Sequence, residues 1–408
     1  MRLLFVHQNA PGQYKHLARH LASFPENEVV FIGKVQRDIP NVTMVTYAPS
    51  RAPGKDTHHY LRAFEGQVLH GQAVVRAAMG LLKRGFVPDV ICAHPGWGEA
   101  LFLKDVFPTA KLLAFCEFFY RSRGSDVGFD PQQEVTLDMA CRIRTKNATL
   151  LTSLEAADWG VSPTEWQRSQ HPAEFRSKIS VVHEGVDTEL CRPDADVTVT
   201  LPDGRTLSRG QEVVTYIARN LEPYRGFPTF MRAAEEICRR RPKAEILVIG
   251  GDDISYGAPP AGAANWREKM LAEVRIDPQR VHFLGKVPYE SFLKIVQVSR
   301  AHIYLTYPFV LSWSMLEAMA CGAVIIGSDT PPVAEVIEDG RNGLLVDFFD
   351  PKAVADRVDA ALDQPERMAA IRETARRSVV ERFDLRSVCL PAQVRLIEAL
   401  HAGRSPDL

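Results

Sequence analysis

The chain has 408 residues, of which 46% are hydrophobic and 24% charged, ordinary values for a globular protein that exclude wholesale disorder. With 49 Lys and Arg against 50 Asp and Glu, the formal net charge is −1, so nucleic acid is not an expected partner. No apolar run approaches the roughly 18–20 residues that a membrane-spanning helix needs. The seven cysteines form no C-x-x-C pair and sit mostly in apolar runs, which favours reduced core residues of a cytoplasmic protein.

Short apolar runs alternate with helical patterns along the first half of the chain. Continuous apolar runs are typical of strands buried on both faces, and four of them stand at Leu3–Val6, Val29–Ile32, Val90–Ala93 and Leu112–Phe115. Amphipathic stripes predict helices over Gly12–Ala22 and His70–Lys83. This alternation indicates an α/β domain with a parallel sheet.

The second half repeats the same alternation more clearly. The predicted strands are Val213–Ile217, Glu245–Ile249, Val281–Leu284, Ile303–Leu305, Val324–Ile326 and Leu344–Val346. The predicted helices are Phe227–Arg239, Trp266–Val274, Tyr289–Val298, Ser314–Cys321 and Ala353–Leu362.

The predicted organisation is two Rossmann-like α/β domains in tandem. The N-terminal domain is expected over residues 1–190 and the C-terminal domain over 213–385. A linker over 191–212 carries an alternating run, Val197–Leu201, and an Asp203-Gly204 turn signal, which together predict a small β-hairpin. A final helix, predicted over Ser387–Ala402 within the segment 386–408, is expected to close across the domains.

The strongest local signal is the segment from Phe309 to Asp329, which predicts a loop, a short helix, a glycine stop and a buried strand. Helix N-termini bind anions through free backbone N–H groups. Glu317, one turn into the helix, could accept hydrogen bonds from a sugar hydroxyl. The alternative is that Ser314 and Glu317 form an S-x-x-E capping box that only closes the helix end.

A second signal follows the strand Val213–Ile217, where a loop carries Arg219 and Arg225 and then Gly226. Two guanidinium groups at the carboxyl end of a strand, beside a helix N-terminus, suit a diphosphate. The alternative is a solvated loop with two surface arginines.

Together with Val281–Pro288, these segments stand in the order and spacing of the carboxyl-terminal domain of GT-B glycosyltransferases, and they resemble family 4, the retaining "group 1" enzymes. In that family a strand precedes G-R-x-x-x-x-K-G, and a later E-x7-E segment precedes A-M-A-C-G. Arg219 and Arg225 match the two basic residues, with Arg in place of Lys and a loop one residue longer. Glu317 matches the second Glu, whereas the first falls on Phe309.

The resemblance implies donor-binding roles. Arg219 and Arg225 would act in catalysis by stabilising the donor diphosphate, and Glu317 would hold the ribose hydroxyls. Phe309 replaces a carboxylate that helps to grip the donor sugar, which implies an unusual sugar preference. The other donor contacts implied are Gly12 near the phosphates (or an ordinary turn), Gly285, Lys286 and Val287 beside the base, Ser312 where the family has glycine, and the free N–H groups of Ser314, Met315 and Leu316 at the diphosphate.

The first half carries the candidates for the acceptor side. His94 ends the strand Val90–Ala93 and resembles the family's D-V-V-H-A-H stretch, so it is a candidate to bind the acceptor or the sugar; the alternative is a structural histidine. Asn9, Tyr120 and Asp126 complete the expected acceptor side.

Glu117 ends the strand Leu112–Phe115, where many relatives carry a catalytic-site histidine, although Cys116 competes for that register. Glu117 is the candidate carboxylate facing the acceptor or the anomeric centre. The alternative is a salt bridge to Arg121 or Arg123.

The resemblance therefore implies a retaining glycosyltransferase that moves a sugar from a nucleotide-diphosphate sugar, with UDP as the expected base, to an acceptor hydroxyl in a cleft between the domains. No cofactor and no metal site are expected, since fixed positive groups replace the ion. The alternatives are a GT-B epimerase or phosphorylase, or a non-catalytic nucleotide-sugar binder. The acceptor, whether glycan, lipid-linked or small molecule, stays open. The expected location is cytoplasmic, with peripheral contact at the inner membrane face as an option.

Overall fold

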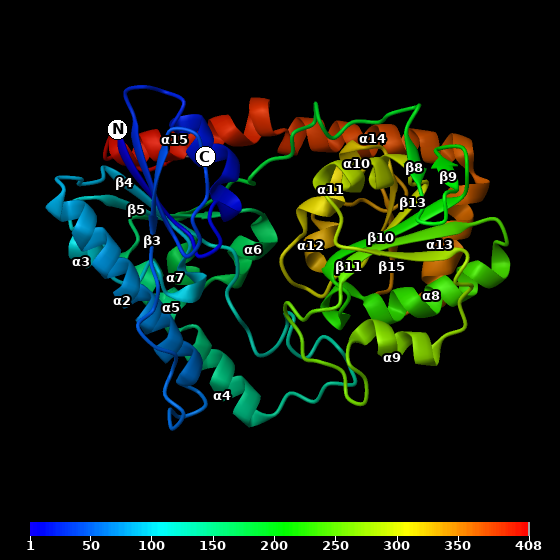
Figure 1. Ribbon diagram of the computed structural model, residues 1–408, viewed down its shortest axis with the longest axis horizontal. Coiled ribbons are helices and arrows are strands. Elements are labelled where there is room, and N and C mark those ends of the chain that lie inside the picture. Colours follow the sequence, from blue (N-terminus) through cyan, green and yellow to red (C-terminus); the bar gives the residue numbers. More distant parts are fainter. Residues whose placement is uncertain (407–408) are drawn as a thin grey trace. The chain divides into compact units, whose positions relative to one another are not determined.

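The computed structural model describes residues 1–406, and the chain divides into two compact units (Figure 1). The first unit comprises Met1–Gly185 and the segment that begins at Leu385. The second is the continuous stretch Val186–Asp384, so the predicted linker hairpin lies in the second unit and the last helix in the first. No helix within residues 1–406 has the length and apolar character of a membrane span.

The first unit is built on a seven-stranded parallel sheet, in the order β3-β2-β1-β4-β5-β6-β7. The strands are β1 (Arg2–Val6), β2 (Glu28–Gly33), β3 (Val42–Thr46), β4 (Val90–Ala93), β5 (Lys111–Phe115), β6 (Trp159–Ser162) and β7 (Ile179–Val181). Strands β1, β2, β4 and β5 are those predicted from apolar runs, and they lie together in the sheet because buried strands are apolar on both faces. Strands β3, β6 and β7 were not predicted.

Helices cover both faces of this sheet. They are η1 (Gly12–Tyr14), α1 (Lys15–Leu21), α2 (Arg62–Lys83), η2 (Pro95–Trp97), α3 (Leu103–Val106), α4 (Leu137–Lys146), α5 (Ala148–Ala156), α6 (Glu165–Gln170), α7 (Ala173–Arg176), the π-helical turn η4 (Leu385–Cys389) and α15 (Leu390–His401). One core lies between the sheet and α1 and α15, and the other lies under α2, α3 and α5.

The second unit has a six-stranded parallel sheet, in the order β12-β11-β10-β13-β14-β15. Its strands are β10 (Val213–Asn220), β11 (Glu245–Gly251), β12 (Val281–Gly285), β13 (Ala301–Tyr304), β14 (Val324–Ser328) and β15 (Leu344–Val346), all of them predicted. The predicted hairpin is present as the antiparallel pair β8 (Thr198–Thr200) and β9 (Thr206–Ser208). Its flanking Val197 and Leu201 are buried in the core of this unit.

The helices of the second unit are η3 (Pro223–Arg225), α8 (Phe227–Arg240), α9 (Trp266–Glu273), α10 (Tyr289–Val298), α11 (Trp313–Ala320), α12 (Pro331–Ala334), α13 (Pro351–Asp363) and α14 (Pro365–Phe383). The long helix α14 was not predicted.

In each sheet, the order in which successive strands are added reverses at one pair of neighbouring strands. The chain winds outward in opposite senses from β1 and β4 in the first unit, and from β10 and β13 in the second. Open parallel sheets bind ligands beyond the carboxyl ends of the strands at such a switch point. The loops after these four strands are therefore the places to look for a site.

Candidate active site

Three polar side chains stand at the carboxyl ends of three neighbouring strands in the first unit. His7 follows β1, His94 follows β4 and Glu117 lies two residues beyond β5. His7 is 2% exposed and His94 3%, whereas the Glu117 side chain retains 29% of its exposure. Two buried imidazole rings therefore lie near a carboxylate that solvent or a ligand can reach.

Backbone N–H groups fix the protonation of both histidines. Asn9 N–H donates to Nδ1 of His7 (2.9 Å), and Gly96 N–H donates to Nδ1 of His94 (3.1 Å). Since each Nδ1 accepts, the proton of each neutral ring sits on Nε2. Each histidine therefore has Nε2–H as its available hydrogen-bond donor.

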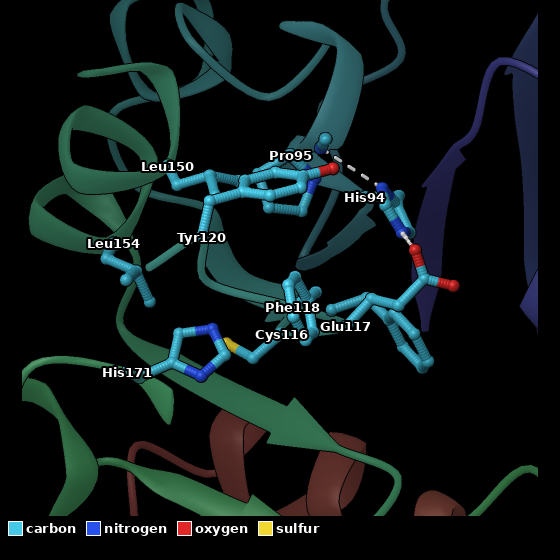
Figure 2. A pocket seen from close by; sticks show the side chains of 11 residues that line it. His94, Pro95, Cys116, Glu117, Phe118, Tyr120, Leu150, Leu154 and His171 are labelled. Carbon is cyan, nitrogen blue, oxygen red and sulfur yellow. Dashed lines mark hydrogen bonds and ion pairs between the residues drawn. The ribbon is translucent and has the colours of Figure 1, made fainter. Parts of the chain in front are cut away.

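Both histidines are linked to Glu117, one of them through Gln13. Nε2 of His94 lies 3.3 Å from Oε2 of Glu117 (Figure 2). Nε2 of His7 lies 2.6 Å from the side-chain oxygen of Gln13, and the Gln13 amide donates to Oε1 of Glu117 (2.8 Å). One histidine thus acts on the carboxylate directly and the other through Gln13.

These contacts set the charge of the cluster. Burial alone would raise the pKa of Glu117, but its interactions with His94 first, and then with His7 and Gln13, outweigh burial and hold that pKa below its usual value. Burial, reinforced by the neighbouring His94, lowers the pKa of His7 to about 3. At neutral pH the cluster therefore holds an ionised Glu117 beside a neutral His7.

Gly12 and Trp97 shape the same cluster. Gly12 has φ +52°, and a Cβ there would lie 2.4 Å from Cε1 of His7, so only glycine lets the loop pass the ring. Trp97 stacks on His94 with ring centroids 4.5 Å apart. The structure thus gives Gly12 a packing role, and its predicted proximity to donor phosphates stays a prediction.

A small cavity of about 30 Å³ lies beside the His94–Glu117 pair, lined in part by Tyr120 (Figure 2). That volume has room for a few water molecules and is too small to enclose a sugar. Lys146 Nζ stands 3.4 Å from the centroid of the Tyr120 ring, and burial lowers the pKa of Lys146 to about 8. Asp126, another predicted acceptor-side residue, is buried and accepts from the Ser125 hydroxyl.

The cluster decides between two readings of Glu117. The predicted alternative, a salt bridge to Arg121 or Arg123, is wrong: within residues 1–406 the ion pair of Glu117 is with His94, and Arg121 donates to the carbonyl groups of Ser169 and Gln170. The structure brings Glu117 together with His94, both of which were candidates. It also adds His7 and Gln13, which the sequence analysis missed; the only signal was a histidine directly after a buried strand.

In the second unit, Arg219 and Arg225 differ in environment. Arg219 is exposed near the end of β10, and its side chain makes no hydrogen bond within residues 1–406. Arg225 is buried, and its Nη1 donates to the Thr306 hydroxyl (2.8 Å), the Val310 carbonyl (3.0 Å) and the Tyr304 hydroxyl (3.2 Å). The reading of two surface arginines is therefore wrong for Arg225.

Arg225 joins the loops after two adjacent strands. It precedes α8, after β10, and its bond to Val310 reaches the loop after β13, the neighbour of β10 in the sheet. In the same β13 loop Phe309 is 7% exposed, and its ring centroid lies 4.9 Å from that of Tyr256 and 5.6 Å from that of Tyr224. Phe309 thus belongs to an aromatic cluster where the family pattern has a carboxylate.

Helix α11 begins earlier than the sequence predicted. Ser312 is its N-cap, and Ser312 Oγ accepts from Ser314 N–H at 3.4 Å. Met315 N–H lies 3.3 Å from the Ser312 carbonyl, so the expectation that the N–H groups of Ser314 and Met315 are free needs correction. Leu316 and Met315 are fully buried in the core.

The capping-box reading of Glu317 is wrong. Because the helix starts at Trp313, Glu317 lies too far along it to bond the cap. Its Oε1 instead accepts a 2.7 Å hydrogen bond from the Tyr289 hydroxyl. Glu317 therefore keeps a carboxylate near the same edge of the sheet as the two arginines.

The loop after β12 carries the remaining predicted residues. Gly285 has φ +66°, which favours glycine, and Val287 packs partly buried against the core. Lys286 is exposed and pairs with Asp253 at 2.9 Å. Their predicted contact with the donor base stays a prediction.

Two family models match successive parts of the chain. The model "Glycosyl transferase family 4 group" matches residues 25–191, and "Glycosyl transferases group 1" matches residues 203–378. Together they span most of both units. The chain belongs to the group 1 glycosyltransferases.

Curated relatives of this glycosyltransferase include D-inositol 3-phosphate glycosyltransferase of Nocardia farcinica, 29% identical over 47% of this chain and 42% of that protein. Alpha-maltose-1-phosphate synthase of Mycolicibacterium smegmatis is 26% identical over 57% of this chain and 61% of that protein. The chain thus spans less than half the length of the first of these relatives and under two thirds of the second.

Solved structures share the fold. Sucrose-phosphate synthase from Thermosynechococcus elongatus superposes with a TM-score of 0.74 at 16% identity, covering 99% of this chain and 100% of that chain. Anabaena HepE in complex with UDP-glucose gives a TM-score of 0.66 at 15% identity, covering 98% and 100%. The fold of this group 1 glycosyltransferase is therefore GT-B, with two Rossmann-like α/β domains, as predicted.

Proposed function

We propose that this protein is a retaining glycosyltransferase that transfers a sugar from a UDP-sugar to an acceptor hydroxyl without a metal ion. One observation carries the proposal. The matched group 1 region contains Arg219 at the end of β10, Arg225 just after that strand, and Glu317 on α11, which follows the neighbouring strand β13. The complex of HepE with UDP-glucose, a protein of the same fold, supports UDP as the donor nucleotide.

The chemistry requires positive charge at the leaving group. When the anomeric bond breaks, negative charge grows on the β-phosphate of the nucleoside diphosphate. The exposed guanidinium of Arg219 would meet that charge directly, and buried Arg225 would add a fixed positive field behind it. Such preorganised charge stabilises the transition state more than the ground state.

On the acceptor side, ionised Glu117 is the group offered to an incoming hydroxyl. It accepts from Gln13, lies 3.3 Å from Nε2 of His94 and keeps exposed surface for a further donor. A hydrogen bond from the acceptor hydroxyl would orient the attacking oxygen. Because His7 stays neutral, it does not cancel the negative charge of Glu117.

The test combines binding with turnover. Thermal shifts are measured with UDP-, GDP-, dTDP- and ADP-sugars, and nucleoside diphosphate release is assayed with a panel of acceptors. Arg219→Ala and Glu317→Gln should abolish the donor-induced shift with little change in the apo melting temperature. Arg232→Ala, which removes an exposed arginine paired with Glu273 on α8 and α9, is the matched control.

The rival functions give different products. Epimerised sugar nucleotide without transfer would indicate an epimerase, and turnover that requires inorganic phosphate a phosphorylase. A non-catalytic binder is favoured by one observation, Phe309 in place of the sugar-gripping carboxylate. Donor binding without turnover across the acceptor panel would establish that alternative. A shift unaffected by both Arg219→Ala and Glu317→Gln would contradict the proposed donor site.

A further inference from the structure

Four arginines gather at the amino-terminal edge of the second unit's sheet, opposite the edge proposed to bind the donor. Arg209 precedes β10, Arg300 precedes β13, and Arg372 and Arg376 lie one turn apart on α14. The Arg300 N–H donates to the Val213 carbonyl (2.8 Å), and β10 and β13 are neighbours. Arg300 therefore lies beside the start of β10, the strand that the loop carrying Arg209 leads into.

Helix α14 brings its arginines to this edge, where it runs beside α11 (Figure 1). Nη2 of Arg372 donates to the carbonyl of Arg300 (3.2 Å). Nη1 of Arg376 donates to the carbonyl of Ala320, the last residue of α11 (2.7 Å). These bonds tie the helix to the starts of the central strands.

Arg209 reaches the same place from the loop after β9. Its Nη2 lies 3.2 Å from where a Cβ on Gly322 would stand, and Gly322 follows α11 by two residues. The side chain of Arg209 is half-buried and makes no hydrogen bond to any other part of residues 1–406. Its guanidinium is therefore held near the others without a partner of its own.

No acid within residues 1–406 pairs directly with this group, although Asp363, whose direct partner is Arg241, is close enough to Arg300 to interact with its charge. Throughout residues 1–406, no carboxylate oxygen lies within 4.0 Å of a guanidinium nitrogen of these four arginines. Glu373, the nearest acid along α14, pairs with Arg377. Burial and then repulsion from Arg300 and Arg209 lower the pKa of Arg372 to about 10.

Hydrogen bonds to protein carbonyl groups explain the position of some of these arginines. Arginines bond the last carbonyl groups of helices and oppose the helix dipole there. Arg376 uses three of its five N–H donors on protein carbonyls, that of Ala320 at the end of α11 and those of Thr188 and Cys191 in the turn after β7. The guanidinium of Arg300 donates one bond, to the Leu362 carbonyl near the end of α13, and that of Arg372 donates one, to the Arg300 carbonyl before β13. Most of their N–H donors are therefore unused.

We propose that Arg209, Arg300 and Arg372 bind a phosphate group, either inorganic phosphate or the phosphoryl end of a phosphate monoester. Planar guanidinium forks match the oxygens of a phosphate dianion, and its charge relieves the repulsion among the three arginines. The site lies on the edge of the sheet away from Arg219 and Glu317, so it does not depend on the proposed function.

The test is calorimetric titration of the full chain with sodium phosphate and with glucose 6-phosphate, using glucose and sodium chloride at matched ionic strength as blanks. Arg209→Ala is the main variant, because this side chain makes no described hydrogen bond and its loss should leave the fold intact. We expect it to weaken phosphate binding about tenfold or more. Arg377→Ala, on the same helix but paired with Glu373, should bind like the native protein.

Arg219→Ala separates this site from the donor edge. Binding that persists in Arg219→Ala and is lost in Arg209→Ala supports the proposal. Loss in Arg219→Ala with retention in Arg209→Ala would place the anion at the donor edge and overturn it, as would heat that never saturates in the millimolar range. Equal affinity for phosphate and glucose 6-phosphate identifies the phosphoryl group alone as the ligand, and tighter binding of the ester identifies a monoester.

Discussion

The side-chain amide of Gln13 donates a 2.8 Å hydrogen bond to Glu117, although 104 positions separate the two residues in the chain. The oxygen of the same amide faces Nε2 of His7 at 2.6 Å, so Gln13 cannot flip without placing two donors or two acceptors face to face. The orientation of Gln13 therefore follows from the backbone N–H of Asn9 that fixes His7. A chain of neutral hydrogen-bonding groups therefore fixes the position of the Glu117 carboxylate.

Gln13→Leu should impair catalysis while leaving donor binding intact. It removes one of the hydrogen bonds that lower the pKa of Glu117, so that pKa should rise and the acid limb of the rate profile should move to higher pH. We expect kcat/KM to fall about tenfold. Gln8→Leu changes a glutamine of the same loop and is the control. An unshifted pH profile in Gln13→Leu would show that Gln13 does not act through Glu117.

Stability should fall in mild acid because buried histidines cannot protonate in the folded state. His302 is fully buried, its Nδ1 lies 2.8 Å from the Thr215 hydroxyl, and burial lowers its pKa to about 3. Below about pH 6.5 the unfolded chain binds a proton that the folded chain refuses, so each such histidine costs about 1.4 kcal/mol per pH unit until its folded pKa is reached.

Urea unfolding measured between about pH 6 and pH 5 checks this expectation. His302→Gln should reduce the slope of unfolding free energy against pH, whereas His401→Gln, at an exposed position, should not. A native slope near zero in this range would contradict the neutral state of these histidines.

The start of α11 can be tested by two serine substitutions. Ser312→Ala removes the N-cap and should cost about 1 kcal/mol of unfolding free energy. Ser314→Ala, inside the first turn, should cost less. Urea denaturation that ranks the two variants in the opposite order would mean that the helix begins where the S-x-x-E pattern places it.

Phe309→Glu should destabilise the second unit. The side chain is 7% exposed between Tyr224 and Tyr256, so a carboxylate there loses solvation and we expect a cost of about 3 kcal/mol. Phe309→Leu controls for lost aromatic contacts. If the proposed donor site is right, Phe309→Glu also changes the order of preference among sugar nucleotides, and an unchanged order would remove the sugar-selective role of Phe309.

The central strands of both sheets could be predicted because burial on two faces makes them continuously apolar. Strand β3 lies at the sheet edge and is half exposed, β6 is interrupted by Gly160 and ends in Ser162, and β7 has three residues, so none of them carries that signal. Predicting α14 failed for a related reason: only five of its nineteen residues are buried, and its pattern is dominated by charge.

The site residues also divide into those that a local sequence pattern predicts and those that it does not. Arg219, Arg225 and Glu317 were found through a local spacing that matches a family. Gln13 had no such spacing, and only the parallel order of β1, β4 and β5 brings it to Glu117. The burial of Arg225 was also beyond the sequence, since it depends on Thr306 and Val310 in a loop about eighty positions away.

The return of the chain to the first unit at Leu385 has a consequence for biosynthesis. Leu396, Ile397 and Leu400 of α15 lie in the same core as β1 and α1, so the unit whose synthesis starts first is finished last. A fragment ending near Gly185 would leave that apolar surface uncovered, whereas Val186–Asp384 is one uninterrupted stretch. The nascent protein must therefore keep its opening strands soluble while the whole of the inserted unit emerges from the ribosome.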